Sequence, residues 1–159
     1  MKLNLREPKP GDIGWVIAKH GEVYSQQFRL NSRFEVDIAR KIVSFFGNPS
    51  AFDTFIIAEI EGNRAGSIAV SKQSETIAFV NFLLVLKKYQ GRGIAGALMR
   101  KVIQHAKEYP FHYLHLETYG ILQDARKLYQ KMGFACYKTI ANVEKYGRVF
   151  DQEFWKLTL

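Results

Sequence analysis

The sequence predicts an α/β protein with a mixed, predominantly antiparallel sheet flanked by helices. Three strand-like segments, 54–61, 64–72 and 76–86, follow one another through short turns, which is typical of an antiparallel meander. The strand at 76–86 is then joined to a strand at 111–118 through a helix, a connection that makes two strands parallel. We therefore expect a parallel strand pair in the centre of the sheet and a cleft between its members.

One strand and two helices precede the meander. Alternation of apolar and polar residues from Leu3 predicts a short first strand. The helix that follows has Asp12 as its expected N-cap, and Gly21 is expected to interrupt its apolar spacing. Ser32 and Glu35 have the spacing of a capping box at the start of the second helix.

The remaining elements alternate between helix and strand. Gly62-Asn63 is a dipeptide that tolerates positive φ, and it predicts the turn between the first two meander strands. Later come a helix that ends before Pro110, a helix over about 123–132 with Gly133 as its C-cap, and two strands near 134–140 and 152–159.

Length and composition predict one domain over residues 1–159. The chain has 159 residues, of which 47% are hydrophobic, enough to bury a core. No run approaches the roughly 20 apolar residues of a membrane span, and the first residues lack the apolar core of a secretory signal. We expect a cytoplasmic location and no membrane association.

Cysteine and charge limit the cofactors that the chain can use. The single cysteine, Cys136, excludes an internal disulfide, and no Cys/His spacing indicates a metal site. We expect Cys136 to be a small buried hydrophobic residue rather than a nucleophile that forms a covalent intermediate. The 23 Lys+Arg against 15 Asp+Glu give a formal charge of +8, which favours anionic ligands such as a polyphosphate cofactor or nucleic acid.

The strongest chemical signal is the segment in which a strand leads through glycines into a helix. Glycines let the backbone approach a ligand closely, and the free N–H groups of a first helical turn attract anions. Side chains of Gln90 and Arg92 can add further donors. The expected cofactor-binding residues of this turn are Gln90, Gly91, Arg92, Gly93, Ile94, Ala95 and Gly96, and the expected ligand carries a diphosphate.

The same turn also fits other hypotheses. Gly91, Gly93 and Gly96 have the spacing of the dinucleotide-binding fingerprint, and Glu117 follows near the next strand, as in an NAD(P)-dependent oxidoreductase. The antiparallel meander before the turn disfavours this hypothesis, because that fold repeats strand–helix units in a parallel sheet. A glycine turn that binds nothing is another alternative, and a nucleotide-hydrolase loop lacks its Gly-Lys-Ser/Thr.

Two motifs resemble those of the GNAT superfamily of acetyltransferases. They are Gln90-x-x-Gly93-x-Ala95, similar to Gln/Arg-x-x-Gly-x-Gly/Ala, and Ala125-x-x-Leu128-Tyr129-x-x-x-Gly133-Phe134. The resemblance implies a parallel strand pair splayed to hold acetyl-CoA, with the backbone of Leu83, Leu84 and Val85 pairing with the pantetheine arm. It also implies acetyl transfer to an amine by direct attack in a ternary complex. The segment from Pro10 to Tyr24 further resembles acetyltransferase domains of bacterial MarR fusions.

The resemblance implies roles for individual residues. Tyr129 would donate a proton to the leaving thiolate, and a backbone N–H of the strand bearing Val85, helped by a bulge, would stabilise the oxyanion. Glu117 is a candidate general base, and Lys131 a candidate phosphate contact. Leu122 departs from the family pattern, because many relatives carry a cofactor-binding Asn there.

The acceptor site is expected between the N-terminal helices and the last hairpin. Its candidate residues are aromatic and suit an apolar or cationic amine: Tyr24, Phe28, Tyr119 and Tyr146. The four histidines are expected to be structural. The amine itself stays open between a small molecule, a protein N-terminus and a lysine. A noncatalytic acyl-CoA-sensing module is the main alternative, nucleic-acid binding is disfavoured, and a homodimer is a further expectation.

Overall fold

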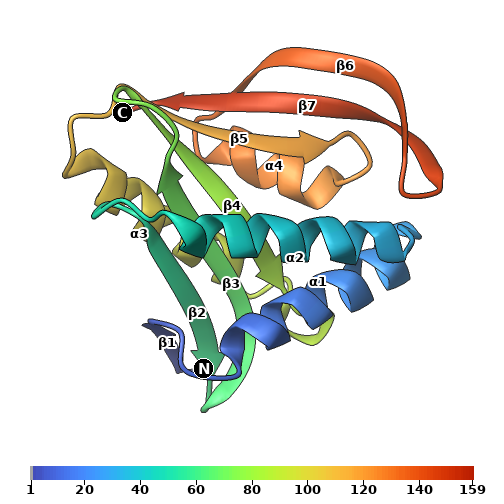
Figure 1. The fold of residues 1–159 in the computed structure, drawn as a ribbon, viewed down its shortest axis with the longest axis horizontal. Coiled ribbons are helices and arrows are strands. Elements are labelled where there is room, and N and C mark those ends of the chain that lie inside the picture. The colour runs from blue at the N-terminus through green and yellow to red at the C-terminus, as the bar shows by residue number, and fades with distance from the viewer. Residues whose placement is uncertain (1) are drawn as a thin grey trace.

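The computed structural model describes residues 2–159 and contains seven strands in one sheet. The elements are β1 (Leu3–Arg6), α1 (Asp12–Phe28), α2 (Ser32–Gly47), β2 (Thr54–Ile60), β3 (Asn63–Lys72), β4 (Ile77–Val85), a 3-10 turn (Lys87–Tyr89), α3 (Ile94–Lys107), β5 (Tyr113–Tyr119), α4 (Gln123–Lys131), β6 (Ala135–Lys145) and β7 (Arg148–Thr158). Their arrangement is shown in Figure 1.

The sheet is mixed, as the sequence predicts. Its strand order is β1-β2-β3-β4-β5-β7-β6, and every neighbouring pair is antiparallel except β4 and β5. A doubly wound dinucleotide-binding sheet is parallel throughout its core, so this topology does not support the NAD(P) hypothesis. The predicted α/β fold class is confirmed.

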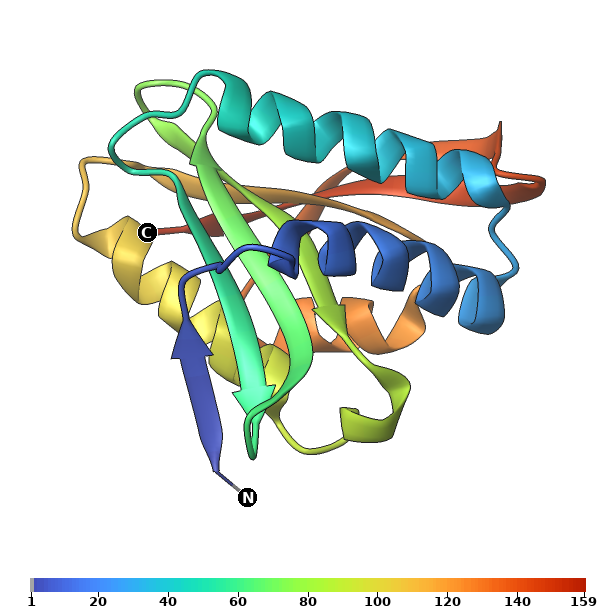
Figure 2. The same cartoon turned by 60° about the horizontal axis from the view of Figure 1, so that its bottom comes forward.

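Helices cover both faces of the sheet (Figure 2). Strand residues alternate between the two layers: Ile56 and Ala58 of β2 pack with the core under α3, whereas Phe55 and Ile57 pack with α1 and α2. This period of two is what a strand buried on both faces requires. Each layer is closed by an apolar helix stripe, such as Leu98 and Val102 of α3.

The two parallel strands separate soon after they meet. β4 pairs with β5 only from Ile77 opposite Tyr113 to Phe79 opposite His115, and beyond these residues the strands diverge (Figure 1). A bulge bends β4 further, since Ser67 lies opposite Leu84 but Ala69 lies opposite Asn81. The cleft expected between the parallel strands therefore has a structural origin in both features.

Several predicted helix boundaries are wrong by one residue. The N-cap of α1 is Gly11, with φ 94°, and Asp12 is the first helical residue, turned inward to accept hydrogen bonds from Arg6 and the Lys9 N–H. The N-cap of α2 is Asn31 rather than Ser32, because the Asn31 side chain already accepts the Arg33 N–H at 3.1 Å.

Gly21 does not interrupt α1, which runs unbroken from Asp12 to Phe28. A Cβ at this position would collide with the Glu35 carboxylate, so the missing side chain lets α2 approach closely. The predicted capping box between Ser32 and Glu35 is wrong, because the N-cap of α2 is Asn31 and Ser32 is already helical. The glycine thus serves helix–helix packing rather than a helix end.

The turns and last strands also differ from prediction. The first meander turn uses Glu61 and Gly62, at φ 51° and 79°, one residue earlier than predicted. β6 and β7 are longer than predicted and meet at Tyr146-Gly147. Since β6 is exposed along nearly its whole length, its sequence lacks the alternation that marks a half-buried strand. Cys136 lies on β6 and is exposed, so the prediction of a buried residue is wrong.

Candidate active site

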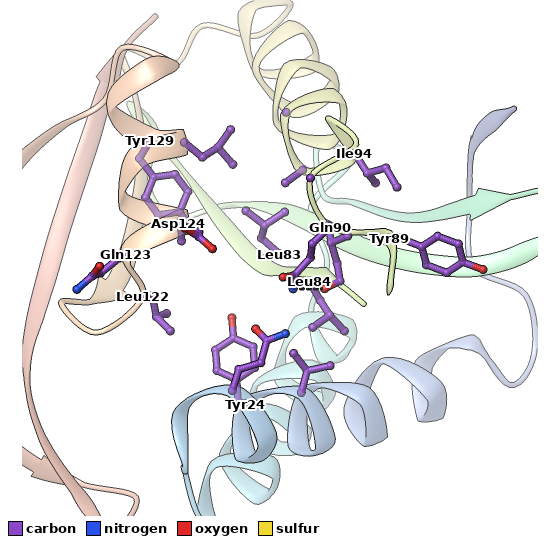
Figure 3. A pocket seen from close by; sticks show the side chains of 18 of the residues that line it. Tyr24, Leu83, Leu84, Tyr89, Gln90, Ile94, Leu122, Gln123, Asp124 and Tyr129 are labelled. Carbon is purple, nitrogen blue, oxygen red and sulfur yellow. Dashed lines mark hydrogen bonds between the residues drawn. The ribbon is translucent and has the colours of Figure 1, made fainter. Parts of the chain in front are cut away.

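A cleft of about 680 Å³ opens where β4 leaves β5 (Figure 3). Four parts of the chain line it: the second half of α1, the end of β4, the glycine turn with the start of α3, and the segment around the start of α4. The glycine turn contributes backbone groups to the lining, while Leu83, Leu122 and Leu128 contribute apolar side chains from the β4 and α4 sides. An elongated ligand with one anionic part suits this lining.

The glycine turn presents free backbone N–H groups to the cleft. Gly91 and Gly93 have φ of 76° and 78°, which side chains other than glycine's rarely adopt. Gly93 is the N-cap of α3, and the Ala97 N–H is the one that bonds back to the Gly93 carbonyl, at 3.0 Å. The preceding N–H groups of the first turn, at Ile94, Ala95 and Gly96, are therefore left for a ligand, and all three residues line the cleft.

The side chains expected to assist this turn are placed differently. Gln90 lines the cleft, but its Nε2 donates to the Val85 carbonyl at 2.9 Å and so holds the turn against β4. Arg92 is outside the lining, and its guanidinium lies 5.7 Å from the centre of the Tyr89 ring. Lys131 is exposed in the last turn of α4, whose first turn faces the cleft. Backbone N–H groups, rather than these side chains, are thus the main hydrogen-bond donors available to an anion in the cleft.

β4 offers a free backbone edge along the cleft. Its pairing with β5 ends at Phe79, so the groups from Val80 onward have no strand partner on that side. Phe82 has φ 57° in the bulge, and its carbonyl accepts the Ser67 hydroxyl at 2.7 Å. Leu83, Leu84 and Val85, the expected pantetheine-pairing residues, all line the cleft next to this edge.

A second, smaller cavity of about 110 Å³ lies between the diverging strands and the two N-terminal helices. Glu117 and Tyr119 line this cavity, as do His20, Phe34 and Lys41. Four residues line both spaces: Tyr24, Leu83, Leu122 and Tyr129. These four residues, which we call the junction, mark the place where ligands entering from the two sides would meet.

Two phenol groups stand at the junction, from different elements. Figure 3 shows Tyr24 on α1 and Tyr129 on α4 on opposite sides of the pocket. Burial raises the pKa of Tyr24 to about 12, and burial, with a smaller effect of Tyr24, raises the pKa of Tyr129 above its ordinary value. Both phenols therefore keep their protons at neutral pH and can donate them.

The remaining predicted site residues divide between the two cavities. Phe28 lines the main cleft, whereas Glu117 and Tyr119 line the small cavity. The Glu117 carboxylate accepts a hydrogen bond from the side-chain amide of Gln152. Tyr146 lines neither space; it is buried, and its hydroxyl donates to Asp37 Oδ2 at 2.8 Å, which fastens the last hairpin to α2.

His20, which is expected from the sequence to be structural, is buried on α1. Its Nδ1 lies 2.8 Å from the Val16 carbonyl, and its ring stacks on Tyr24 with centroids 5.8 Å apart. It lines the small cavity. His20 and Tyr24 are four residues apart, so they lie on one face of α1. This spacing would have allowed His20 to be predicted beside Tyr24 from the sequence. His105, by contrast, bonds to Phe52 and Thr54 away from both cavities.

In residues 2–159 no group of three or more His, Cys, Asp or Glu side chains is arranged to hold a metal ion. None of the helices in that same range combines the length and apolarity that crossing a bilayer demands.

The sequence model of the Acetyltransferase (GNAT) family matches residues 18–134, which include the glycine turn, the β4 edge and Tyr129. The chain belongs to the GNAT acetyltransferase family.

Curated relatives of this GNAT protein are longer than the matched region. N-acetyltransferase 8B of Mus musculus is 30% identical over 78% of this chain and 50% of its own length. N-acetylaspartate synthetase of Homo sapiens is 33% identical over 50% of this chain and 27% of its own length. The chain thus spans half or less of the curated relatives that it matches.

Solved structures share the fold over the whole GNAT chain. A phosphinothricin acetyltransferase from Sinorhizobium meliloti in complex with acetyl-CoA superimposes with a TM-score of 0.78 at 18% identity, covering 100% of this chain and 89% of that one. A ribosomal-protein-alanine N-acetyltransferase from Brucella melitensis gives 0.78 at 18% identity, covering 98% and 99%. Similarity at this level of identity establishes the fold.

The departure from the GNAT pattern at Leu122 is visible at the start of α4. Leu122 is the N-cap of that helix and makes no side-chain cap. It is buried at the junction, where a polar residue would reach both cavities. Gln123 and Asp124 are the polar neighbours that line the main cleft there.

Proposed function

We propose that this protein is an acetyl-CoA-dependent N-acetyltransferase whose catalytic domain comprises residues 1–159. The observation that carries the proposal is the junction at Tyr24, Leu83, Leu122 and Tyr129, where an anion-binding cleft meets a separate small cavity. An enzyme that joins two substrates in a ternary complex needs two entrances that converge on one point. Membership of the GNAT family supports acetyl-CoA as the ligand of the cleft.

The cleft has a place for each part of acetyl-CoA. The N–H groups of Ile94, Ala95 and Gly96 would hold the pyrophosphate, as expected for a helix N-terminus. The unpaired edge of β4 from Leu83 to Val85 would bond with the amides of the pantetheine arm, as an added strand would. The thioester then reaches the junction beside Tyr129.

The chain offers groups for both proton transfers. Glu117 would take one proton from the incoming ammonium, and the neutral amine would attack the acyl carbon, forming the C–N bond. A backbone N–H beside the bulge in β4 would stabilise the oxyanion. When the C–S bond breaks, Tyr129 would protonate the thiolate and recover a proton from the amide nitrogen, so that one proton leaves through Glu117.

Further expectations belong to the same proposal. The exposed Cys136 lies outside both cavities, which supports direct transfer rather than a covalent acetyl-enzyme. We also propose kinship with the acetyltransferase domains of MarR fusions, a cytoplasmic location, and a homodimer. The formal charge of +8 agrees with an anionic cofactor, and nucleic acid is not part of the proposal.

The first test is calorimetric titration of the purified protein with acetyl-CoA, CoA, NADH and NADPH at moderate salt. We expect acetyl-CoA to bind with a dissociation constant on the order of micromolar and both nicotinamide cofactors to give no heat. Release of free CoA in the presence of a panel of amines then reports catalysis. Binding of NADH or NADPH without binding of acetyl-CoA would refute the proposal, whereas acetyl-CoA binding without turnover of any amine would indicate a sensing module.

A further inference from the structure

The small cavity carries information about the acceptor, and the inference drawn from it rests on the proposed acetyl transfer. Its volume of about 110 Å³ holds roughly four groups of water size at about 30 Å³ each. To reach the cleft, an acceptor nitrogen must pass the junction residues Tyr24, Leu83, Leu122 and Tyr129. A carbon branch next to the nitrogen would then lie beside these four side chains. The cavity thus suits a narrow, unbranched arm.

Glu117 brings a carboxylate to the lining of the small cavity. Glu117 is partly buried and accepts a hydrogen bond from Gln152, a neutral amide, and no ion pair joins it to a basic side chain within residues 2–159. The two buried acids elsewhere differ: Asp12 pairs with Arg6 and Arg64, and Glu153 pairs with Arg126. A partly desolvated carboxylate without a cation favours binding of one.

His20 adds a second acceptor to the same cavity. The Val16 carbonyl can only accept, so the His20 Nδ1 at 2.8 Å must carry the proton of that bond. Burial keeps the ring neutral by lowering its pKa to about 4. The lone pair of Nε2 is therefore available, and the side chain is 2% exposed in a wall of the cavity. This atom can accept an N–H but cannot donate one.

The other walls also favour a cation. They are formed largely by the aromatic rings of Tyr24, Phe34, Phe79, Phe82 and Tyr119. The buried Thr118 hydroxyl has no partner and lines the cavity as well. Lys41 is the one basic side chain in the lining with a fixed charge, and it is exposed on α2, where solvent screens it.

We propose that the acceptor of this enzyme is an unbranched primary alkylamine, bound as its ammonium ion between Glu117, the His20 Nε2 and the aromatic walls. Such amines have a pKa near that of lysine, about 10.4, and are cationic at neutral pH. Glu117 removes one proton, the freed nitrogen attacks the acyl carbon, and CoA leaves as its thiol. The shared chemistry comes from two sources, a free alkylamine or the side chain of a lysine in a peptide.

The turnover experiment uses amines that differ in one feature. n-Butylamine is compared with its α-branched isomer sec-butylamine, which has the same atoms and the same charge. A peptide with a blocked N-terminus and one lysine is compared with a lysine-free peptide whose α-amine is free. We expect kcat/KM to favour each unbranched amine by about 10-fold or more. The faster of n-butylamine and the lysine peptide identifies the source.

A binding experiment separates this inference from the proposed acetyl transfer. The CoA complex is titrated with n-butylammonium and with the neutral isostere 1-butanol, and no reaction is needed. We expect the ammonium ion to bind about 10-fold more tightly or better. Glu117→Gln should remove this preference, whereas Glu144→Gln, which loses an exposed carboxylate on β6, should keep it.

Each outcome bears on one of the two claims. Preferential ammonium binding without acetyl transfer would support the cationic site and refute the catalytic proposal. Turnover confined to sec-butylamine or to the free α-amine would overturn the inference and leave acetyl transfer intact. Equal binding of n-butylammonium and 1-butanol to the wild-type protein would also overturn it.

Discussion

Single residues at the junction decide what the two cavities can do. Tyr129 is 6% exposed and packs its ring against Phe134 and Trp155. It thus serves the core and lines both cavities at once, a combination that suits a tyrosine, whose apolar ring carries a polar hydroxyl. Tyr24 provides a second hydroxyl from the opposite side (Figure 3). Removing the hydroxyls one at a time separates chemistry from packing.

We expect Tyr129→Phe to lower kcat by about 10²- to 10⁴-fold, the usual contribution of a general acid. Affinity for acetyl-CoA should change little, because the ring and its packing stay in place. Thiol-release kinetics and calorimetry measure the two quantities. Tyr137→Phe is the matched control: Tyr137 lies on exposed β6, and its hydroxyl contacts His115 of β5, outside both cavities. Equal kcat values for wild type and Tyr129→Phe would exclude the proton-donor role.

Among the elements, the turn before α3 depends most on backbone geometry. Gly91 and Gly93 adopt left-handed φ, so that the following N–H groups face the cleft. The bulge in β4 and the hydrogen bond from Gln90 to Val85 hold this turn next to the strand edge. Cofactor binding is thus a property of the strand, turn and helix taken together.

We expect Gly91→Ala to weaken acetyl-CoA binding about 10-fold, because straining the turn misdirects its N–H groups. Gly62→Ala is its matched control, because Gly62 has a similar φ, 79° against 76° for Gly91. A new Cβ meets nothing within 4 Å at either position. Gly62 lies in the turn between β2 and β3, away from the cleft. Both variants should lose about 1–2 kcal/mol of unfolding free energy from left-handed strain. Urea denaturation measures the stability of both variants, and calorimetry measures their affinity for acetyl-CoA. Equal affinity in the two variants would count against an anion-binding role for the turn before α3.

At the scale of the whole molecule, one cluster of ion pairs around the buried Asp12 connects the N-terminal elements. Asp12 at the start of α1 is bonded to Arg6 of β1 at 2.6 Å and to Arg64 of β3 at 3.1 Å. Arg6 also reaches Glu59 of β2 at 2.8 Å. Hydrogen bonding from Arg6, opposed by burial, lowers the pKa of Asp12 to about 2 from its ordinary 3.8. The cluster therefore stabilises the fold in its ionised form.

The pH dependence follows from the direction of that shift. Because the folded-state pKa lies below the unfolded one, the contribution is fully present above about pH 4 and is lost as the pH falls towards 2. It corresponds to about 2 kcal/mol. We expect Asp12→Asn to unfold more easily at pH 7 and to show a shallower loss of stability between pH 4 and 2. Urea denaturation against pH tests this, and Glu108→Gln, which removes an exposed carboxylate at the C-cap of α3, should retain the wild-type slope.

The element order, the mixed sheet, the glycine turn and the family can all be predicted from the sequence. These features depend on local patterns: strand periodicity, the positive φ that glycine allows, and residues spaced along one helix face. The glycine turn from Gln90 to Gly96 is a candidate site from its own pattern, whereas Tyr129 and the β4 residues Leu83, Leu84 and Val85 are candidates through the family resemblance. The second half of β6 was not predicted, because an exposed strand has no buried face and its sequence therefore lacks alternation of apolar and polar residues.

Contacts between side chains of distant elements could not be predicted from the sequence, because they depend on how the elements pack. Asp12 was expected to cap its own helix, yet it binds arginines from two strands. Tyr146 is predicted to line the acceptor site, yet its hydroxyl bonds to Asp37 of α2. His20, which is predicted to be structural, lines the small cavity. The sequence predicts a cleft between β4 and β5, but the residues at which the strands separate are set by the bulge in β4 and by the short pairing of the two strands. The cavities depend on that separation, and so does their meeting at the junction.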